Sequence, residues 1–324
     1  MPGGETEDIA MARSSLTDRL VDLRRGYTGE NLSQAVPAVR AALHADDVRR
    51  RVAAALDGVG TARGLVLPDA EDDAQRALEC VVFQAGTDAG AHLQLRPPAS
   101  MLRPAHAFRA AEPGPLSRLH LTGYALGPLL FELLPREEDG WLAGVPGLRT
   151  RQHPRSLELV LLDTEASVVF AGVDARRFAE GMDYVRTLMT GRGLTGVFVD
   201  GPLSAAERDH LAEFPRPTGL GSALLRRPHL FADTPWVRSW SQGDTWWVEW
   251  PESVGVTGVV DRLLDPVFGF ANVREVPGVA GGLGLSDGWR ELFLRVVDGP
   301  DPAHEEALAA ADWPEGVTGW GRTT

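Results

Sequence analysis

Ser156-Leu-Glu-Leu-Val-Leu-Leu-Asp-Thr-Glu-Ala-Ser-Val-Val-Phe-Ala-Gly172 contains two apolar runs separated by a short polar stretch that starts at Asp163. Val, Leu and Phe in such runs favour strands, and an Asp between them favours a turn. We therefore predict a hairpin of strands over 156–162 and 167–172. A helical pattern over 174–190 follows directly. Hairpins mixed with helices, without regular alternation of strand and helix, predict an α+β fold.

Toward the C-terminus the same mixture continues. Ser204 can cap a helix, and residues 290–297 fit a strand and a helix equally well. The other elements predicted there are a strand over 195–200, a hairpin over 236–250, a helix over 256–264 and a short Ala-rich helix beyond residue 300.

Toward the N-terminus we predict a strand over 63–67, a helix up to about residue 83, a strand over 92–96 and an apolar helix over 124–134. The apolar run at 64–67 with its helix resembles the run at 196–199 with its helix faintly, as two copies of one unit would. The Gly-Val-Pro-Gly stretch at 144–147 is the best candidate for a boundary between regions.

The domain organisation that follows has four parts. We predict that residues 1–13 form a disordered leader, 14–57 a short helical segment, and 58–147 and 148–324 two α+β regions with mainly antiparallel hairpins. In the helical segment, apolar residues at helical spacing predict one packed face. This face consists of Leu16, Leu20, Leu23, Val39, Leu43, Val52 and Leu56.

Composition limits the class of protein. The chain has 324 residues, 44% of them hydrophobic and 24% charged, which is ordinary for a globular protein with a core. The formal net charge of −13 disfavours binding to nucleic acid and to anionic membranes. No apolar run approaches the length of a membrane span. The first ten residues carry three acids and no base, unlike a signal peptide, so we expect a cytoplasmic protein.

Lysine is absent, and every basic side chain is Arg or His. A Walker A loop, a protein kinase and a pyridoxal-phosphate enzyme each need a Lys, so these classes are excluded. Ile and Asn are scarce whereas Ala, Gly, Arg and Pro are plentiful. Codons for the scarce residues are rich in A and T, which indicates a bacterial source with a GC-rich, actinobacterial-type genome.

Sites for metals and cofactors have no local signal. The single cysteine, Cys80, lies among apolar residues and is expected to be a buried small side chain. The eight histidines show none of the usual ligand spacings, so no metal site is predicted. Gly191-Arg-Gly-Leu-Thr-Gly196 matches a dinucleotide fingerprint, but here the helix comes first and the strand second, opposite to the required order. No cofactor is predicted.

Two alternatives to a binding protein remain open. Gly284-Leu-Ser-Asp-Gly288 matches the nucleophile motif of serine hydrolases, with Asp298 and His304 following in the required order. This pattern makes Ser286, Asp298 and His304 weak catalytic candidates. The second alternative is a DNA-associated regulator, suggested by Arg49–Arg51 in the helical segment. Residues 14–57 contain seven arginines and six acids, too balanced for a typical phosphate-binding module.

The hairpin predicted over 236–250 contains five of the nine tryptophans. Alternation along its strands puts Val237, Ser239, Trp246, Val248 and Trp250 on one face, which lacks charges and is the natural core face. The other face is predicted to hold Trp236, Arg238, Trp240, Trp247 and Glu249. The turn is centred on either Gln242-Gly243 or Gly243-Asp244, and both registers give the same faces. In the Gly243-Asp244 register, Arg238 stands opposite Glu249. Cover from another part of the same chain would explain such a face, but Trp and Arg also commonly anchor binding. The leading prediction is a binding protein for a small molecule, a peptide or a protein partner.

Overall fold

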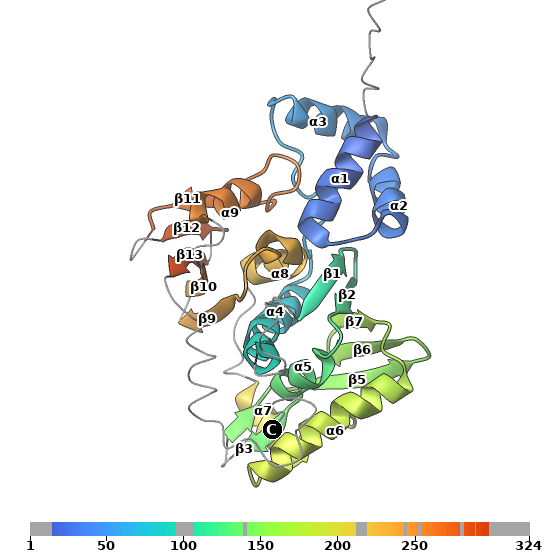
Figure 1. The fold of residues 1–324 in the computed structure, drawn as a ribbon, viewed down its shortest axis with the longest axis vertical. Coiled ribbons are helices and arrows are strands. Elements are labelled where there is room, and N and C mark those ends of the chain that lie inside the picture. The colour runs from blue at the N-terminus through green and yellow to red at the C-terminus, as the bar shows by residue number, and fades with distance from the viewer. Residues whose placement is uncertain are drawn as a thin grey trace, which may run out of the picture.

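The structure is a computed structural model that describes residues 15–94, 107–138, 141–211, 219–242, 245–251, 255–278, 282–288 and 290–297 (Figure 1). The fold is α+β, as predicted. The helices are α1 (Leu16–Thr28), α2 (Leu32–Ala42), α3 (Asp46–Leu56), α4 (Asp73–Gln94), α5 (Leu126–Leu133), α6 (Ala175–Gly191), α7 (Ala205–His210), α8 (Gly219–Leu225), the 3-10 helix η1 (Pro228–Phe231) and α9 (Val256–Leu263).

Within the described residues, the strands form two five-stranded sheets and one three-stranded sheet. The first sheet contains β1 (Phe108–Glu112), β2 (Ser117–Leu121), β5 (Leu148–His153), β6 (Ser156–Leu161) and β7 (Ser167–Ala171). The second sheet contains β9 (Arg238–Gln242), β10 (Thr245–Pro251), β11 (Arg274–Val276), β12 (Leu283–Ser286) and β13 (Glu291–Val297). The small sheet contains β3 (Arg136–Glu138), β4 (Trp141–Ala143) and β8 (Thr195–Val197).

The first and second sheets share one topology. Their strand orders are β1-β2-β7-β6-β5 and β9-β10-β13-β12-β11. Neighbouring strands are antiparallel except β2 with β7 and β10 with β13, which are parallel. Each sheet therefore consists of a hairpin and a three-stranded meander. The second strand of the hairpin is hydrogen-bonded to the last strand of the meander, β2 to β7 and β10 to β13.

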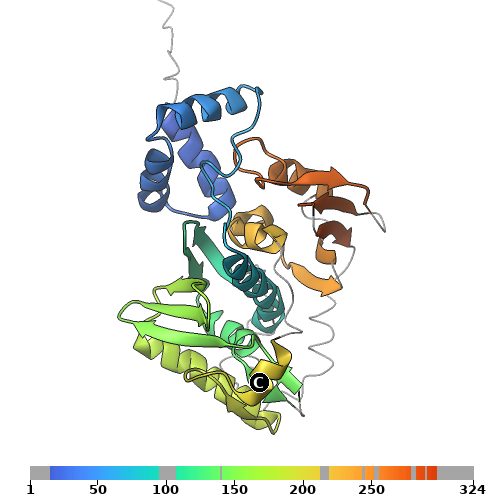
Figure 2. The same ribbon diagram turned by 180° about the vertical axis from the view of Figure 1, so that it is seen from behind.

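The helices follow the same repeat. One helix precedes each hairpin, α4 or α8, and one lies between hairpin and meander, α5 or α9. We call residues 73–171 the first repeat and residues 219–297 the second. The sequence similarity between residues 64–67 and 196–199 does not correspond to these two repeats. It would relate α4 to α7, the helix after β8, whereas in the structure α4 corresponds to α8. In Figures 1 and 2, α4 and α8 lie between the two sheets.

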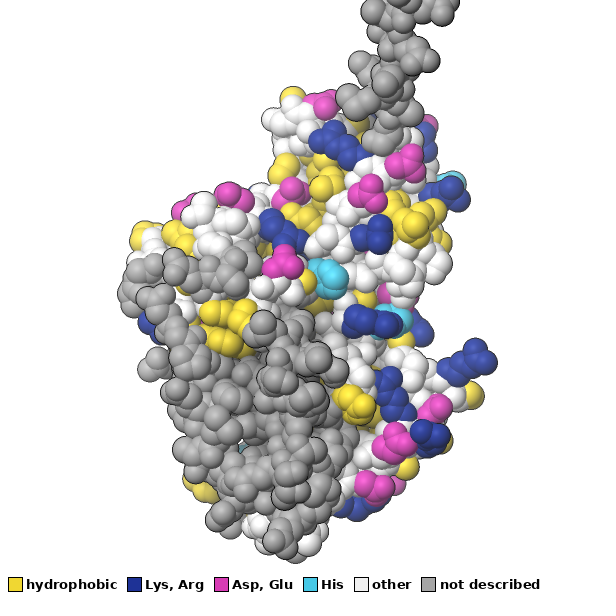
Figure 3. Space-filling view, viewed as in Figure 1, with side chains coloured by type: hydrophobic (Ala, Val, Ile, Leu, Met, Phe, Trp, Pro, Cys, Tyr) yellow, Lys and Arg dark blue, Asp and Glu magenta, His cyan; other side chains and the backbone are white. Residues whose placement is uncertain are grey.

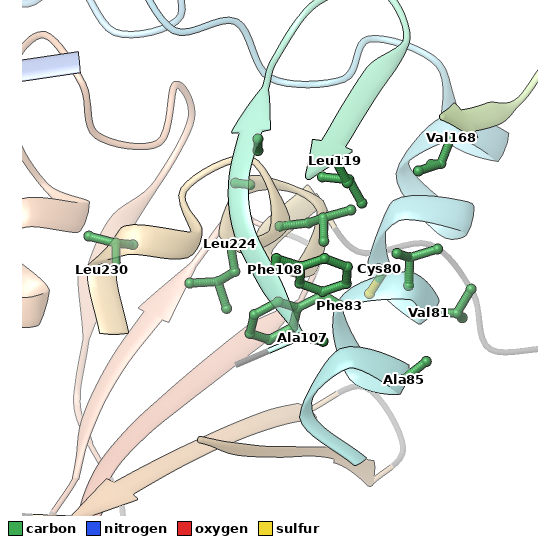
Figure 4. Close-up of a cluster of buried hydrophobic side chains, with 14 of the residues drawn as sticks. Cys80, Val81, Phe83, Ala85, Ala107, Phe108, Leu119, Val168, Leu224 and Leu230 are labelled. Atoms are coloured by element: carbon green, nitrogen blue, oxygen red, sulfur yellow. The ribbon is translucent and has the colours of Figure 1, made fainter. Parts of the chain in front are cut away.

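The repeats meet where α4 packs against α8. A Cβ on Gly221 would lie 2.4 Å from Sγ of Cys80, so only glycine permits this close approach. Cys80 is buried, as predicted. Figure 4 shows Cys80 and Phe83 of α4 beside Phe108 of β1, Leu119 of β2 and Leu224 of α8. One hydrophobic core therefore runs through both repeats.

A buried polar cluster crosses the same junction. Glu79 of α4 and Arg226, which directly follows α8, form an ion pair with both side chains almost completely buried. Ser117 of β2 and Ser222 of α8 donate hydrogen bonds to the Glu79 carboxylate, at 2.7 and 2.6 Å. Arg226 also donates to the carbonyl of Pro68. Because both charges are paired and multiply bonded, their burial is tolerated.

The helical segment packs largely as predicted. Leu20, Val39, Leu43 and Val52 are buried, and Leu16 and Leu56 pack against the core. Leu23 was predicted to pack inward but is 37% exposed.

The buried face of α1 instead includes Arg24 and Tyr27. Arg24 is paired with Glu30 and donates to the carbonyl of Val66, which compensates its burial. The Tyr27 ring stacks on Phe268 at 5.3 Å. Burial, reinforced by the charge of Asp265, raises the pKa of Tyr27 to about 12. These two polar side chains dock the helical segment on the rest of the chain.

Other predictions for local structure need correction. Residues 63–67 form turns, held in place where the N–H of Ala62 donates to the carbonyl of Pro266. His92 lies inside α4 because this helix continues to Gln94. Residues 291–297 form a strand, which resolves the ambiguity there. The hairpin β6–β7 is confirmed, and Asp163 in its turn adopts a φ of 62°.

Two other features bear on the predicted organisation. The boundary predicted at residue 147 runs through the first sheet, because β2 pairs with β7 across it. The predicted leader, residues 1–13, lies outside the described residues.

Candidate functional site

The tryptophan hairpin is formed by β9 and β10. Trp240 pairs with Trp247 and Arg238 with Glu249, the register expected for a Gly243-Asp244 turn. The turn itself lies outside the described residues. The core face is also confirmed, because every residue predicted there is buried. These residues are Val237, Ser239, Trp246, Val248 and Trp250.

The opposite face carries a row of aromatic rings. The indoles of Trp240 and Trp247 stack with a centroid distance of 6.0 Å and an interplanar angle of 5°. The ring of Phe293 from β13 follows at 5.0 Å from Trp247. Trp240 and Trp247 are partly exposed, whereas Phe293 is buried. A Cβ on Gly284 of β12 would lie 3.0 Å from the Phe293 ring, so glycine leaves room for that ring. We call Trp240, Trp247 and Phe293, with Arg238 and Arg295, the aromatic face.

Two guanidinium groups flank the indoles. That of Arg238 lies 5.1 Å from the Trp240 ring centre, and that of Arg295 lies 5.5 Å from the Trp247 ring centre. Cation–π contacts of this kind hold the charges against the rings. Arg295 is also paired with the buried Glu249. Nε of Arg295 is buried, and no hydrogen-bond partner for it is found in the described part of the chain. The arginines and the indoles together suit an apolar or aromatic group that carries an anion.

The structure brings together three of the five predicted binding residues, namely Arg238, Trp240 and Trp247. Trp236 precedes β9 and is buried, and Glu249 is buried beneath Arg295, so neither contributes exposed surface. Phe293 and Arg295 were missed. Their strand lies parallel to β10 and more than forty residues further along the chain, a pairing that local patterns do not reveal. The sequence of residues 290–297, which fits a strand as well as a helix, indicated only that a strand could form there.

The hydrolase candidate Ser286 ends β12 and is buried. Its Oγ accepts a hydrogen bond of 3.0 Å from the N–H of Gly288. The next element is strand β13, whereas a nucleophile elbow needs a helix at that point. Asp298 and His304 lie outside the described residues. Ser286 is therefore the last residue of a strand, and its hydroxyl holds the start of the connection to the next strand.

The remaining candidates can be placed as well. Gly191 ends α6 and Thr195 begins β8, so the glycine-rich stretch joins a helix to a strand as predicted. Arg49–Arg51 of α3 are exposed, and Arg49 pairs with Asp46 at 3.6 Å. In Figure 3, basic and acidic side chains are interspersed on the face of α1–α3 in view. In the described ranges no helix is long and apolar enough to cross a membrane. The same ranges contain no group of three His, Cys, Asp or Glu side chains placed to hold a metal ion.

Comparison with known proteins gives no family for this chain. No protein-family model matches it, and searches of curated proteins and of solved structures find no significant match.

Proposed function

We propose that the protein is a binding protein that receives an extended peptide segment of a protein partner on its aromatic face. The observation that carries the proposal is the contrast with the first sheet, which has the same topology and a polar outward face. In each sheet, residues paired across neighbouring strands form a row on the outward face, which we call the outward row. In the first sheet, in strand order, this row is Glu112, Arg118, Val169, Glu158 and Arg151. In the second sheet it is Trp240, Trp247, Phe293, Gly284 and Val276.

The outward row of the first sheet is that of an ordinary solvated surface. Arg151 and Glu158 form an ion pair of 3.2 Å, and Arg118 lies 3.9 Å from Glu112. The topology therefore does not require aromatic rings at these positions. Large aromatic side chains on a surface are unfavourable unless something covers them, and clusters of Trp and Arg are enriched where partners bind.

The chemistry of the partner follows from the residues around the indoles. An apolar or aromatic side chain can stack on Trp240 and Trp247, and an acidic side chain can pair with Arg238. Among the described strands, β9 is the outer strand of its sheet, and an extended peptide can add to such an edge. An acidic peptide with one large apolar residue fits best.

The net charge and the composition complete the proposal. An acidic chain favours a protein partner over nucleic acid. The proposed location is the cytoplasm of a GC-rich, actinobacterial-type bacterium, since the chain lacks lysine and is poor in isoleucine. Both statements rest on the sequence.

The first test is the accessibility of the indoles. Acrylamide quenching of Trp fluorescence is measured in the wild type, in Trp240→Phe and in Trp247→Phe. The proposal expects each substitution to remove a quenchable component. Trp141→Phe is the matched control for an indole elsewhere, since Trp141 is 71% exposed on the small sheet. If the two components appear only after residues 298–324 are deleted, the chain itself covers the face and the proposal fails.

The second test is binding of a defined peptide. The probe is the labelled, blocked hexapeptide Val-Asp-Trp-Asp-Val-Thr, compared with a version in which both Asp are replaced by Lys. We expect saturable binding of the acidic peptide only. Trp240→Ala and Trp247→Ala each weaken it about fivefold, and Arg238→Gln weakens it to a similar degree. Equal binding of both peptides, or unchanged binding by these variants, contradicts the proposal.

A further inference from the structure

A cleft of about 800 Å³ opens on a different part of the molecule. Four segments that are distant in sequence line it: the start of α4 with the residues before it, the start of α8, residues 270–273, and the connection from β12 to β13. Its volume is in the range of small-molecule sites, about 300–1,000 Å³. No residue of the aromatic face lines it.

One side of this cleft is fixed by a buried ion pair. Asp69 accepts a hydrogen bond of 2.6 Å from Arg227 and one of 3.0 Å from the N–H of Ala271. Arg227 is completely buried and also donates to the carbonyls of Phe268 and Gly269, at 2.8 and 2.9 Å. These bonds hold residues 268–271 in one conformation. The wall that contains Phe270 is therefore formed before any ligand binds, which lowers the entropic cost of binding.

Charged side chains of both signs line the cleft around Gly219. A Cβ built on Gly219 would lie 3.5 Å from Oδ2 of Asp287 and 3.6 Å from Cδ of Arg76. Arg76 and Asp73, an ion pair, belong to the first turn of α4, whereas Asp287 and Arg290 belong to the connection between β12 and β13. Gly219 thus lies close to a carboxylate and to the side chain of an arginine that belong to different segments of the lining. One small ligand at this place can contact both.

We propose that this cleft binds a small zwitterionic molecule of dipeptide size. Its ammonium group pairs with Asp287, and its carboxylate pairs with Arg76. Its apolar side chains pack against Phe270 and Leu220, which line the same space. Polyanions such as nucleotides are disfavoured, because carboxylates outnumber guanidinium groups among the charged residues that line the cleft.

The probe is the dipeptide L-leucyl-L-phenylalanine, titrated into the full chain by isothermal calorimetry. We expect a Kd on the order of 0.1 mM for a ligand of this size. The N-acetyl derivative lacks the cation and the C-terminal amide lacks the anion, so each should bind about tenfold more weakly. Absence of binding by the dipeptide at about 10 mM, or equal binding of all three compounds, overturns the proposal.

Variants assign the binding to this cleft. Gly219→Phe places a ring between Asp287 and Arg76 and should abolish binding. Its matched control is Gly258→Phe, because a Cβ at this exposed position of α9 meets nothing within 4 Å. Trp240→Ala on the aromatic face should leave binding unchanged. Binding by Gly219→Phe with wild-type affinity, or its loss in Trp240→Ala, places the ligand elsewhere and overturns the proposal.

Substitutions that remove one charge test the orientation of the ligand. They remain informative even if the Gly219→Phe variant does not fold. Asp287→Asn should bind the dipeptide and its N-acetyl derivative about equally, because the partner of the ammonium group is gone. Arg76→Gln should likewise bind the dipeptide and its amide about equally. Wild-type discrimination by both variants contradicts the assigned contacts.

Discussion

The two repeats differ most on the sheet faces that point away from their common core. Both core faces are apolar and tightly packed, with Val168 and Phe170 in the first sheet and Val248 and Trp250 in the second. The outward row of the first sheet is charged, whereas that of the second is aromatic. Since hydrogen bonding and topology are the same, the architecture constrains one face of each sheet and leaves the other free. The aromatic face is thus a property of the second repeat alone.

The largest expected effect concerns the core faces, where the two repeats should behave alike. Trp250→Ala and Phe170→Ala each remove a completely buried ring and should lower the free energy of unfolding by about 4 kcal/mol. Urea denaturation followed by far-UV circular dichroism measures both. A loss below about 1 kcal/mol in one variant would show that its sheet does not pack as described.

The next effect concerns the junction between the repeats. Arg226→Met leaves the Glu79 carboxylate buried without its cation and should cost about 3 kcal/mol. The double variant Glu79→Leu with Arg226→Met removes both charges and should recover a large part of the loss. Thermal unfolding of the wild type and the two variants gives the comparison. A double variant less stable than Arg226→Met would show that the pair is not one coupled unit.

A smaller, pH-dependent effect concerns the contact of α7 with the edge strand of the first sheet. Glu207 of α7 is fully buried against Arg149 of β5, with both Oε–Nη distances at 2.8 Å. Burial pushes the Glu207 pKa upward, but hydrogen bonds from Arg149 and from the N–H groups of Ser204 and Gly147 outweigh it and lower the pKa from 4.5 to about 2. The stabilisation is therefore complete above pH 4.5 and is lost as the pH falls toward 2.

The test uses Glu207→Gln, which has no carboxylate to protonate. The wild type should lose stability more steeply than this variant between pH 4.5 and 2, by roughly 2 kcal/mol over the interval. Urea midpoints at a series of pH values measure the difference. Parallel curves would show that Glu207 has an ordinary pKa.

The smallest effect on stability is expected on the aromatic face. Trp240→Ser and Trp247→Thr approach the polar character of the first sheet's outward row. Each should change the free energy of unfolding by less than about 1 kcal/mol, because the indoles are partly exposed. Urea denaturation beside the Trp250→Ala measurement gives the contrast within one strand. A loss as large as that of Trp250→Ala would mean that the rings are buried by the chain itself.

Local patterns were sufficient for elements whose partners are close in sequence. The hairpins β6–β7 and β9–β10 were predictable because side-chain alternation and a short connection determine which residues share a face. For β9–β10 the sequence left two registers of the same parity, and the structure has the one that pairs Trp240 with Trp247. The predictions for residues 63–67 and for Leu23 were wrong because distant groups decide the structure there. The carbonyl of Pro266 holds the chain at residue 62, and the carbonyl of Val66 helps to bury Arg24 in the face where Leu23 was expected.

The sequence by itself determined the α+β class, the core face of the tryptophan hairpin and the exclusion of lysine-dependent chemistry. These depend on residue identity and on periodicity, which are local. The tertiary structure alone decided the parallel pairing of β10 with β13, which adds Phe293 and Arg295 to the indoles, and the repeat that relates the two sheets. It also decided the cleft, whose walls come from residues about 70 to 290. Pairing and packing over such separations depend on the whole core, so no short stretch of sequence encodes them.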